Sequence, residues 1–292
     1  MQEIRSERPR RRGSLPHAGS AVIRAAPQDA VEESGIEPAV AEARGYRTIV
    51  RKVELEKLGF GRAQRNVPAL LIPVHSPSGE VALYQSRPDE PRLKKDGDPI
   101  KYETPSGSRM TIDVHPSMRN KLGNPDVPLH VTEGIKTGDA MTSRGLCTVT
   151  LLGVWNWRGT NEHGGKTALP DWEYIALEKR KVIIVYDSDV ALKPQVHQAL
   201  DRLKSFLESR GAEVHVVYLP HGEGDKKQGV DDYFVAGHGV DNLLSHATTE
   251  LREQHVGEED PPQVYLATPQ GIVWNKPTRH GTSPTPLTNF VA

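Results

Sequence analysis

Short apolar stretches recur between residues 128 and 250, and each is long enough for one buried strand. They predict strands at residues 129–132, 147–152, 181–186 and 213–219. The intervals between them have helical periodicity, at residues 135–144, 170–179 and 192–210. Strands that alternate with helices in this way predict an α/β domain with a parallel sheet and helices on both of its faces.

The last of these predicted helices has the clearest pattern. Its apolar residues fall on a single stripe, and a glycine follows as a helix stop; they are Val196, Leu200, Leu203, Leu207 and Gly211. We therefore expect this helix to pack on the sheet along that stripe.

Residues 31–127 have a different order of elements and predict a small mixed α+β domain. A helix is expected from Ser34 to Arg44, with Gly45 as its stop. Strands at residues 69–74 and 80–87 flank a Ser-Pro-Ser-Gly segment and predict a hairpin. Residues 88–128 are rich in Pro, Gly and charge, and their pattern does not distinguish a loop from a small sheet.

The two ends of the chain differ from both domains. Residues 1–30 predict a disordered basic arm, which either contacts phosphates or is simply solvated. Residues 251–292 begin as an acidic linker and continue into an expected hairpin at 263–267 and 271–275. The last residues have a strand-like pattern, which predicts the start of a truncated further domain, from a longer parent protein or one completed by a partner.

Composition narrows the class of protein. The chain has 292 residues with 37 Lys and Arg against 38 Asp and Glu, so its net charge of -1 excludes a uniformly basic coat protein but allows a locally basic groove. No apolar run approaches the about 20 residues of a transmembrane helix, and the Arg-rich start does not resemble a signal peptide. The single cysteine excludes internal disulfides and a cysteine-based zinc module. We expect a cytoplasmic protein without a membrane partner.

Acidic residues follow three of the four predicted strands. Glu133 follows the first strand, Asp187 and Asp189 follow the third, and the loop after the fourth leads to Asp231 and Asp232. The carboxyl ends of parallel strands meet at one edge of the sheet, so these side chains are expected to lie together. Carboxylates in such a group repel one another unless a cation lies between them, and oxygen-only ligands favour Mg²⁺ or Mn²⁺.

The Val-Thr-Glu133-Gly and Asp187-Ser-Asp189 segments, in this order, resemble the Toprim fold that bacterial-type primases, topoisomerases and some nucleases share. The resemblance to bacterial-type primases continues in the segments Leu-Pro-His-Gly222 and Gly-Val-Asp231-Asp232. Upstream it includes Ser-Gly79, Arg87 and Pro-Ile-Lys101-Tyr102-Glu-Thr-Pro105, and it spans residues 68–236. The chain is most similar to the uncharacterised Toprim-like domains that precede helicase-type ATPases in mobile-element replication proteins.

This resemblance implies a primase-like nucleotidyltransferase that acts on nucleic acid during mobile-element DNA replication, with Mg²⁺ or Mn²⁺ as cofactor. It implies single-stranded DNA and NTPs as partners, and a helicase-type ATPase in cis or in trans. The implied metal ligands, of which the first three are also the catalytic residues, are Glu133, Asp187, Asp189 and Asp231. The implied nucleic-acid or nucleotide contacts are Arg87, Lys101, Tyr102 and Lys136.

Several assignments stay open at this point. Primases usually carry an Asp four residues after the Glu, but here that position is Thr137 and the nearest acid is Asp139, which a helix would direct elsewhere. Asp231 fits the later acid better than Asp232. Glu133 is either a metal ligand or a general base. The lysines that flank the acidic edge either offset its repulsion of a polyanion or are merely solvated; they are Lys136, Lys226 and Lys227.

Three other functions share part of the pattern. A Toprim nuclease would use the same acids but cleave DNA without NTPs. A degenerate Toprim domain would only bind DNA or dock a helicase. A haloacid-dehalogenase-type phosphatase also has an Asp-x-Asp pair after a strand, but it needs a Ser or Thr soon afterwards, where this chain has Val190, Ala191 and Leu192.

Three further features are given structural interpretations. The segment 159–167 resembles a phosphate-binding loop but has the wrong glycine spacing, so we expect a polar loop. Trp155 and Trp157 offer faces for base stacking, but burial against the sheet edge is the favoured interpretation. Cys147 lies in a predicted strand and is expected to be a small core residue.

Overall fold

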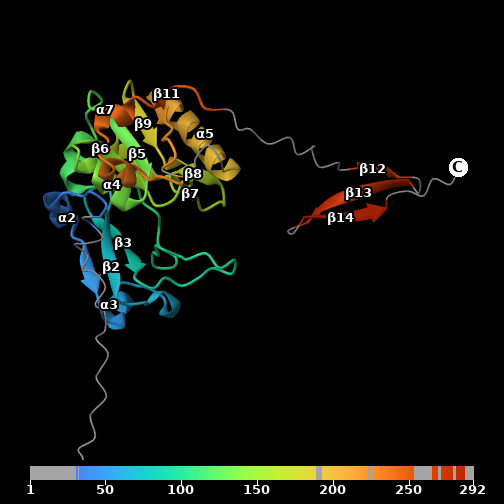
Figure 1. Ribbon diagram of the computed structural model, residues 1–292, viewed down its shortest axis with the longest axis horizontal. Helices are drawn as coiled ribbons and strands as arrows, with labels where there is room; N and C mark the ends of the chain where they lie inside the picture. Colours follow the sequence, from blue (N-terminus) through green and yellow to red (C-terminus); the bar gives the residue numbers. More distant parts are fainter. Residues whose placement is uncertain are drawn as a thin grey trace, which may run out of the picture.

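Figure 1 shows the computed structural model of the chain, which describes residues 31, 33–188, 193–222, 224, 226–252, 265–268, 271–278 and 281–286. Four expectations lie outside the described residues. They concern the basic arm at residues 1–30, the candidate ligand Asp189, most of the acidic linker and the strand-like residues 287–292.

A six-stranded sheet forms the centre of the fold, in the order β11-β10-β9-β5-β6-β4. Its four inner strands are parallel, as the sequence predicts, and they are β5 (Leu129–Glu133), β6 (Cys147–Leu151), β9 (Lys181–Val185) and β10 (Glu213–Val217). The edge strands β4 (Asp113–Val114) and β11 (Ala247–Thr248) are antiparallel to their neighbours. The inner strands are buried on both faces because helices cover both faces, although on one face β5 and β6 carry the buried polar residues His130, Thr132, Thr148 and Thr150.

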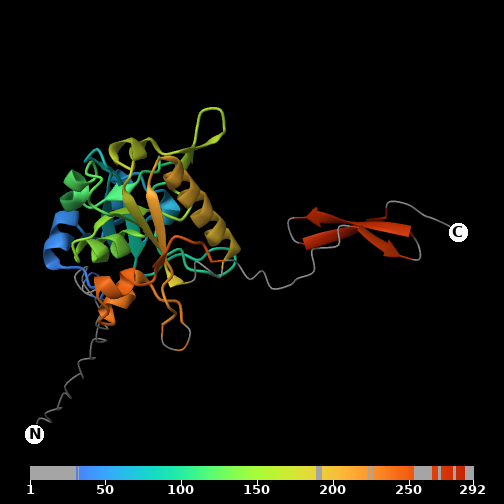
Figure 2. The ribbon, with the colours of Figure 1, turned by 90° about the horizontal axis from the view of Figure 1, so that it is seen from above.

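Helices lie on both sides of this sheet, which confirms the predicted fold class. One face is covered by α5 (Pro194–Ser209) through the expected leucine stripe, Leu200, Leu203 and Leu207. The other face is covered by α4 (Ile135–Thr142), α6 (Val230–Val235) and α7 (Val240–Leu244). Figure 2 shows the long gold α5 on one side of the strands, with the green α4 and the orange α6 and α7 on the other.

The helix α4 lies unusually close to the sheet because its middle residue is Gly138. A Cβ atom at this position would lie 2.1 Å from Thr150 Oγ1 of β6. The preceding Gly134 has φ 83°, a left-handed conformation that glycine adopts without strain, and it turns the chain from β5 into α4. These two glycines bring the start of α4 directly over the carboxyl edge of the sheet.

The N-terminal lobe is a separate antiparallel sheet in the order β1-β2-β3, accompanied by two short helices (Figure 1). Its strands are β1 (Arg47–Ile49), β2 (Ala69–His75) and β3 (Val81–Pro88), and its helices are α2 (Pro38–Arg44) and α3 (Lys52–Lys57). The expected hairpin is therefore present. The first helix begins at Pro38 rather than Ser34, since proline suits the first turn of a helix, and it ends at Gly45 as predicted.

The sequence misses elements that depend on distant contacts. The predicted helix at 170–179 is only a 3₁₀ turn, Pro170–Tyr174, because Ile175 returns to an extended conformation. The expected polar loop at 159–167 is instead a hairpin, β7 (Arg158–Thr160) and β8 (Lys166–Ala168), and its turn is polar. Residues 88–128 are mostly irregular, but they supply β4 and the 3₁₀ helix Pro116–Lys121.

A third sheet lies near the C-terminus, in the order β12-β13-β14. Its strands are β12 (Tyr265–Thr268), β13 (Gly271–Thr278) and β14 (Gly281–Pro286). The first two form the expected hairpin, whereas β14 contains two prolines, which argue against a strand in sequence alone. Among the described residues, no helix is long and apolar enough to cross a bilayer.

Candidate functional site

The carboxyl ends of β5 and β9 lie side by side, because Thr132 pairs with Val185 in register. Glu133 is the exposed last residue of β5, next to the buried Tyr186 that follows β9. Burial raises the pKa of Tyr186 well above its ordinary value, and the nearby Glu133 carboxylate raises it further. The hydroxyl of Tyr186 has no hydrogen-bond partner within the described part of the chain. The structure thus places Glu133 at the edge of the sheet beside an unpaired buried hydroxyl.

Asp187 follows Tyr186 and is held against the loop that leads to α6. Ser188 N donates to Gln228 O at 3.0 Å, and Gln228 N donates to Ser188 Oγ at 2.9 Å. Lys227 Nζ lies 2.8 Å from Asp187 Oδ2, and both side chains are partly exposed. These two hydrogen bonds, one between backbone groups and one to the Ser188 hydroxyl, hold together two segments about 40 residues apart.

Three carboxylates converge around Gly229. A Cβ atom at this position would lie 2.6 Å from Asp231 Oδ1, 3.3 Å from Asp232 Oδ2 and 3.5 Å from Asp187 Oδ1. Only a glycine leaves room for them. We call Asp187, Asp231 and Asp232 the rim cluster.

The two acids at the start of α6 have different roles. Asp232 Oδ2 accepts a hydrogen bond from Gly229 N at 3.2 Å and so caps the helix. Partial burial raises the pKa of Asp231, the neighbouring Asp232 and Asp187 carboxylates raise it further, and Lys136 opposes them. Both acids raise the pKa of Lys136, and the contribution of Asp231 is the larger of the two.

Two cationic side chains and a tyrosine lie near the rim cluster, two of them from the N-terminal lobe and one from α4. We call Arg87, Tyr102 and Lys136 the cationic wall. The Arg87 guanidinium lies 5.8 Å from the centre of the Tyr102 ring. Partial burial lowers the pKa of Lys136, Arg87 lowers it further, and Asp231 raises it. Partial burial raises the pKa of Tyr102, with Arg87 opposing and Asp231 adding to the shift. These couplings place Tyr102 and Lys136 close to Asp231, and they place Arg87 close to Tyr102 and Lys136.

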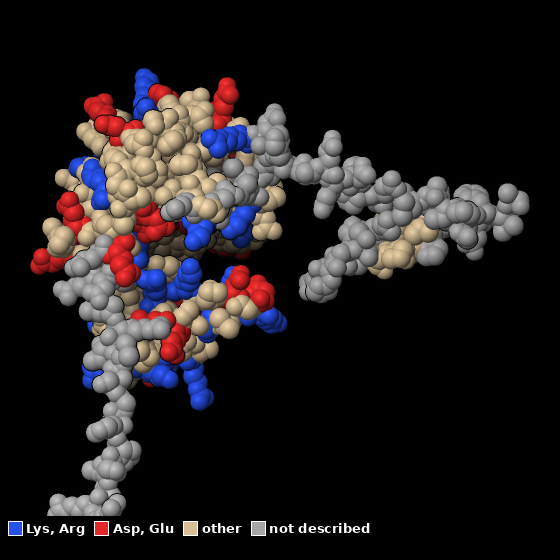
Figure 3. Space-filling model, viewed as in Figure 1, with Lys and Arg blue, Asp and Glu red and all other residues tan. Residues whose placement is uncertain are grey.

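Two contacts build this wall. Ile135, the first residue of α4, packs with Leu70, Ile72 and other apolar residues of the N-terminal sheet, which brings Lys136 next to β3. Glu103 pairs with Ser86 of β3 through two backbone hydrogen bonds of 2.8 and 2.9 Å, which fixes the preceding Tyr102. Lys101 is exposed, and Tyr102 is itself 37% exposed. Figure 3 shows a hollow between the two lobes, with Lys and Arg on its walls and Asp and Glu at its margin.

Asp139, whose role the sequence left open, lies away from the rim in a buried ion cluster. Arg44 donates to Asp139 through Nη2 at 2.6 Å and to Asp113 through Nη1 at 2.6 Å. Tyr46 also donates to Asp139, at 2.6 Å. Burial opposes the charge of Arg44, but the two carboxylates outweigh it and raise the pKa of the guanidinium. We call Arg44, Asp113 and Asp139 the buried cluster. It joins α2, β4 and α4.

The donors at the rim suit a divalent cation in kind, since they are carboxylate oxygens that would otherwise repel one another. Within the described residues, no three acidic, histidine or cysteine side chains form a complete metal site. One of the expected ligands, Asp189, lies outside those residues. Asp187 and Asp231 therefore fit Mg²⁺ or Mn²⁺ by chemistry, and the full set of ligands stays a prediction.

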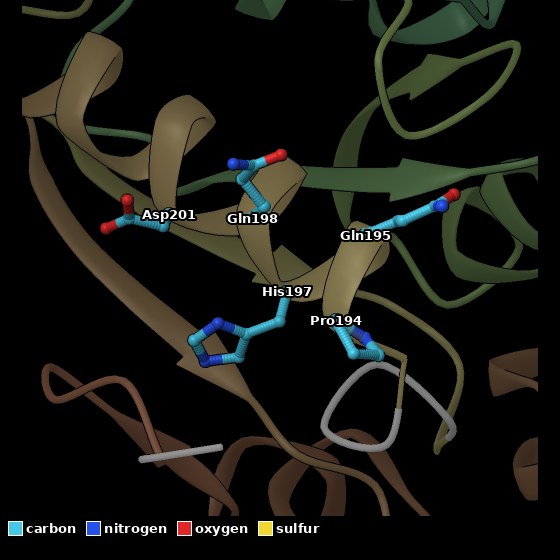
Figure 4. A pocket seen from close by; sticks show the side chains of 5 residues that line it. All are labelled: Pro194, Gln195, His197, Gln198 and Asp201. Carbon is cyan, nitrogen blue, oxygen red and sulfur yellow. The ribbon is translucent and has the colours of Figure 1, made fainter. Parts of the chain in front are cut away.

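The alternative sites have structural roles. Lys166 donates to Thr160 Oγ1 across the β7–β8 hairpin, which is unlike a phosphate-binding loop. Trp157 and Cys147 are buried, as expected, whereas Trp155 is only half-buried. A shallow hollow on α5 is lined by Pro194, Gln195, His197, Gln198 and Asp201 (Figure 4), and His197 hydrogen-bonds the carbonyl of Arg252 at 2.8 Å.

Residues 120–242 match a family described as a domain of unknown function (DUF3854). An uncharacterized protein of Picosynechococcus sp. (strain ATCC 27264 / PCC 7002 / PR-6) is 30% identical over 131 residues. That similarity covers 42% of this chain and 13% of the relative, so the chain spans only a small part of the relative's length.

Solved structures of bacterial primases have the same fold. The zinc-binding and RNA polymerase domains of Aquifex aeolicus primase have a TM-score of 0.51 at 18% identity, over 76% of this chain and 55% of that chain. A DNA primase domain from Pseudomonas aeruginosa has a TM-score of 0.51 at 17% identity, over 79% and 74%. The RNA polymerase domain of Mycobacterium tuberculosis primase DnaG, in complex with double-stranded DNA, has a TM-score of 0.51 at 18% identity, over 76% and 74%.

At these identities the similarity establishes the fold, which is that of bacterial primase catalytic cores. The chain spans about half the length of the Aquifex aeolicus structure. The α/β architecture expected from the sequence is therefore confirmed, while the roles of individual residues stay predictions.

Proposed function

We propose that this chain is a primase-like Toprim protein that transfers nucleotides onto a nucleic-acid strand with the help of a divalent metal ion. The observation that carries the proposal is that the carboxylates of the rim cluster converge around Gly229, with Tyr102 and Lys136 of the cationic wall close to Asp231. Carboxylates suit a divalent cation, and the cations beside them suit the phosphates of the substrate. The fold adds support, because it is similar to that of bacterial primase catalytic cores.

The residues have distinct roles in this proposal. Asp187, Asp189 and Asp231, with Glu133, hold Mg²⁺ or Mn²⁺, which when bound supplies a Lewis acid for the nucleotide phosphates. Arg87 and Lys136 of the cationic wall, with the exposed Lys101, bind phosphate oxygens of the NTP or the strand. Tyr102 lies beneath the Arg87 guanidinium and orients it.

The biological setting is a further part of the proposal. We place the reaction in the replication of a mobile element, on single-stranded DNA and NTPs, together with a helicase-type ATPase in cis or in trans. This part rests on the sequence resemblance of residues 68–236 alone.

A primer-synthesis assay tests the proposed function. Purified protein is incubated with single-stranded DNA, labelled NTPs and Mg²⁺ or Mn²⁺. We expect labelled oligonucleotides from the wild-type protein and none from the Asp187→Ala/Asp189→Ala variant. Asp201→Ala removes an exposed acid of α5 and serves as the matched control, which should retain the product. Equal product from the wild-type protein and the double variant would contradict the assignment, and DNA cleavage without NTPs would indicate a nuclease.

A second function, a metal-independent DNA-binding module, is favoured by one observation. The Lys227 ammonium lies 2.8 Å from Asp187 and already offsets the charge of a candidate metal ligand. Such a module would bind single-stranded DNA equally well in EDTA and in Mg²⁺, and the Asp187→Ala/Asp189→Ala variant would bind as tightly as the wild-type protein. The same samples therefore separate the two functions.

A further inference from the structure

A short loop leaves the sheet immediately beside Glu133. β6 ends at Leu151, which pairs with Glu133 in register, and the carbonyl of Leu151 accepts a hydrogen bond from Gly134 N at 3.1 Å. Neighbouring strands of a sheet lie about 4.8 Å apart. Residues 152–157 therefore begin within one strand spacing of the candidate catalytic glutamate, on the side opposite to β9.

This loop is held in one conformation by its own hydrogen bonds. Asn156 Nδ2 donates to Leu152 O at 2.7 Å, and Asn156 N donates to Gly153 O at 2.8 Å. Gly153 has φ 134°, which favours glycine at the point where the loop turns back. The loop thus presents its remaining side chains from a fixed backbone.

One of its two tryptophans anchors the loop in the core. Trp157 is 7% exposed, and its ring stacks on Phe206 of α5 at 5.2 Å between ring centres. Its carbonyl accepts a hydrogen bond from Trp172 Nε1 at 2.9 Å. The sequence favours burial of both tryptophans, and the structure confirms this for Trp157.

The other tryptophan has a different environment. Trp155 is half-buried, and the Arg158 guanidinium lies 4.3 Å from the centre of its ring. Arg158 forms no ion pair with any of the residues that the structure describes. A half-exposed indole and an arginine without a carboxylate partner among the described residues therefore lie together on the loop that begins beside Glu133.

We propose that Trp155 and Arg158 form a platform for single-stranded DNA, on which one base stacks while the guanidinium contacts the adjoining phosphate. An aromatic ring stacks on any base, and a guanidinium can stack on a base or pair with a phosphate. The platform deepens the proposed function and rests on it, because it assigns the strand a path past β6 to the edge of the sheet. A purely structural Trp155–Arg158 contact is the alternative that the experiment excludes or supports.

Binding of a fluorescein-labelled oligo(dT) strand, followed by anisotropy, tests the platform. Trp155→Ala should weaken binding by about 5-fold to 150-fold, the range that loss of one stacked base produces. Trp155→Phe keeps a flat ring and is the matched control, so it should bind much more tightly than Trp155→Ala. Arg158→Ala should weaken binding and reduce its dependence on salt, because it removes one phosphate contact.

Tryptophan emission provides a second measurement that needs no destabilising change. Trp274 of β13 is also half-buried, so the measurement is made in a Trp274→Phe background. In that background oligo(dT) should quench the emission of the parent protein, and adding Trp155→Phe should remove most of this quenching because Trp157 and Trp172 are buried. Equal affinity of the wild-type protein and Trp155→Ala, or unchanged quenching in Trp155→Phe, would overturn the platform and leave the proposed function intact. Failure of the wild-type protein to bind any single strand would overturn both.

Discussion

The rim cluster, with Lys227 paired to Asp187, and the buried cluster both bring carboxylates together with a cation, but in opposite environments. The side chains of Arg44 and Asp113 in the buried cluster are 1% and 0% exposed. The ion pair at the rim, between Lys227 and Asp187, has side chains that are 53% and 32% exposed. In one cluster every charge has a fixed partner away from water. In the other, the charges remain accessible to an ion or a substrate.

This difference in solvent access indicates which carboxylates can bind an ion or a substrate. Asp139 lies on the same helix that follows Glu133-Gly134, so sequence proximity suggests a place at the edge of the sheet. Its carboxylate instead accepts hydrogen bonds from Arg44 and Tyr46 and is 0% exposed. A carboxylate held in this way connects α4 to α2 and β4, and its two oxygens already accept hydrogen bonds from Arg44 and Tyr46.

The largest expected effect comes from breaking the buried cluster. Arg44→Met leaves two buried carboxylates without their cation and should lower the free energy of unfolding by about 3–5 kcal/mol. Urea denaturation followed by circular dichroism measures this loss. A change below about 1 kcal/mol would show that the buried cluster stabilises the fold no more than an exposed ion pair such as Lys227–Asp187.

The next largest effect is a loss of stability at low pH, which comes from the buried, neutral side chain of His130. Burial lowers the pKa of His130 to about 4, compared with an unfolded value near 6.5. Between these two pH values the unfolded chain binds a proton that the native chain does not, so stability falls as the pH falls from 6.5 towards 4. The loss should reach about 3 kcal/mol.

His130→Leu removes this titration and tests it directly. The difference in unfolding free energy between wild-type protein and variant, measured by urea denaturation from pH 7.5 to pH 4, should change by that amount. A difference that stays constant over this range would mean that His130 titrates alike in the folded and unfolded chains.

The smallest effect on stability is expected at the rim. Lys227→Gln removes a partly exposed ion pair and should change the unfolding free energy by less than about 1 kcal/mol. Under the proposed function, the same change should lower the concentration of Mn²⁺ that raises the melting temperature, because the ammonium no longer competes for Asp187. Unchanged or weaker Mn²⁺ binding would indicate that Lys227 supports the rim rather than competing with the metal ion.

The sequence predicts the framework of the sheet well, because its determinants are local. The apolar runs of β5, β6, β9 and β10 and the leucine stripe of α5 appear where periodicity places them. β4 is missed because two residues carry no periodicity, and it becomes a strand only by pairing with β6. β14 is missed because its prolines argue against a strand.

Part of the candidate site is also predictable, because the acids follow their strands directly in the sequence. The order of acids after successive strands indicates the edge of the sheet, and the structure brings Asp187 together with Asp231 there. Tyr102 and Lys136 also lie near Asp231, and Arg87 lies near both of them. Lys101 is exposed, Glu133 lies beside Tyr186, and the position of Asp189 lies outside the described residues.

By itself, the sequence determined the α/β class, the parallel strands and the acids that follow them, since hydrophobic periodicity and strand order act through neighbouring residues. Only the tertiary structure decided that Asp139 is buried with Arg44, that Lys227 reaches Asp187 and that Trp155 stays half-exposed while Trp157 is buried. The physical reason is that solvent access and ion pairing depend on residues far apart in the chain. Their separation in space is set when the sheet, its helices and the N-terminal lobe pack together.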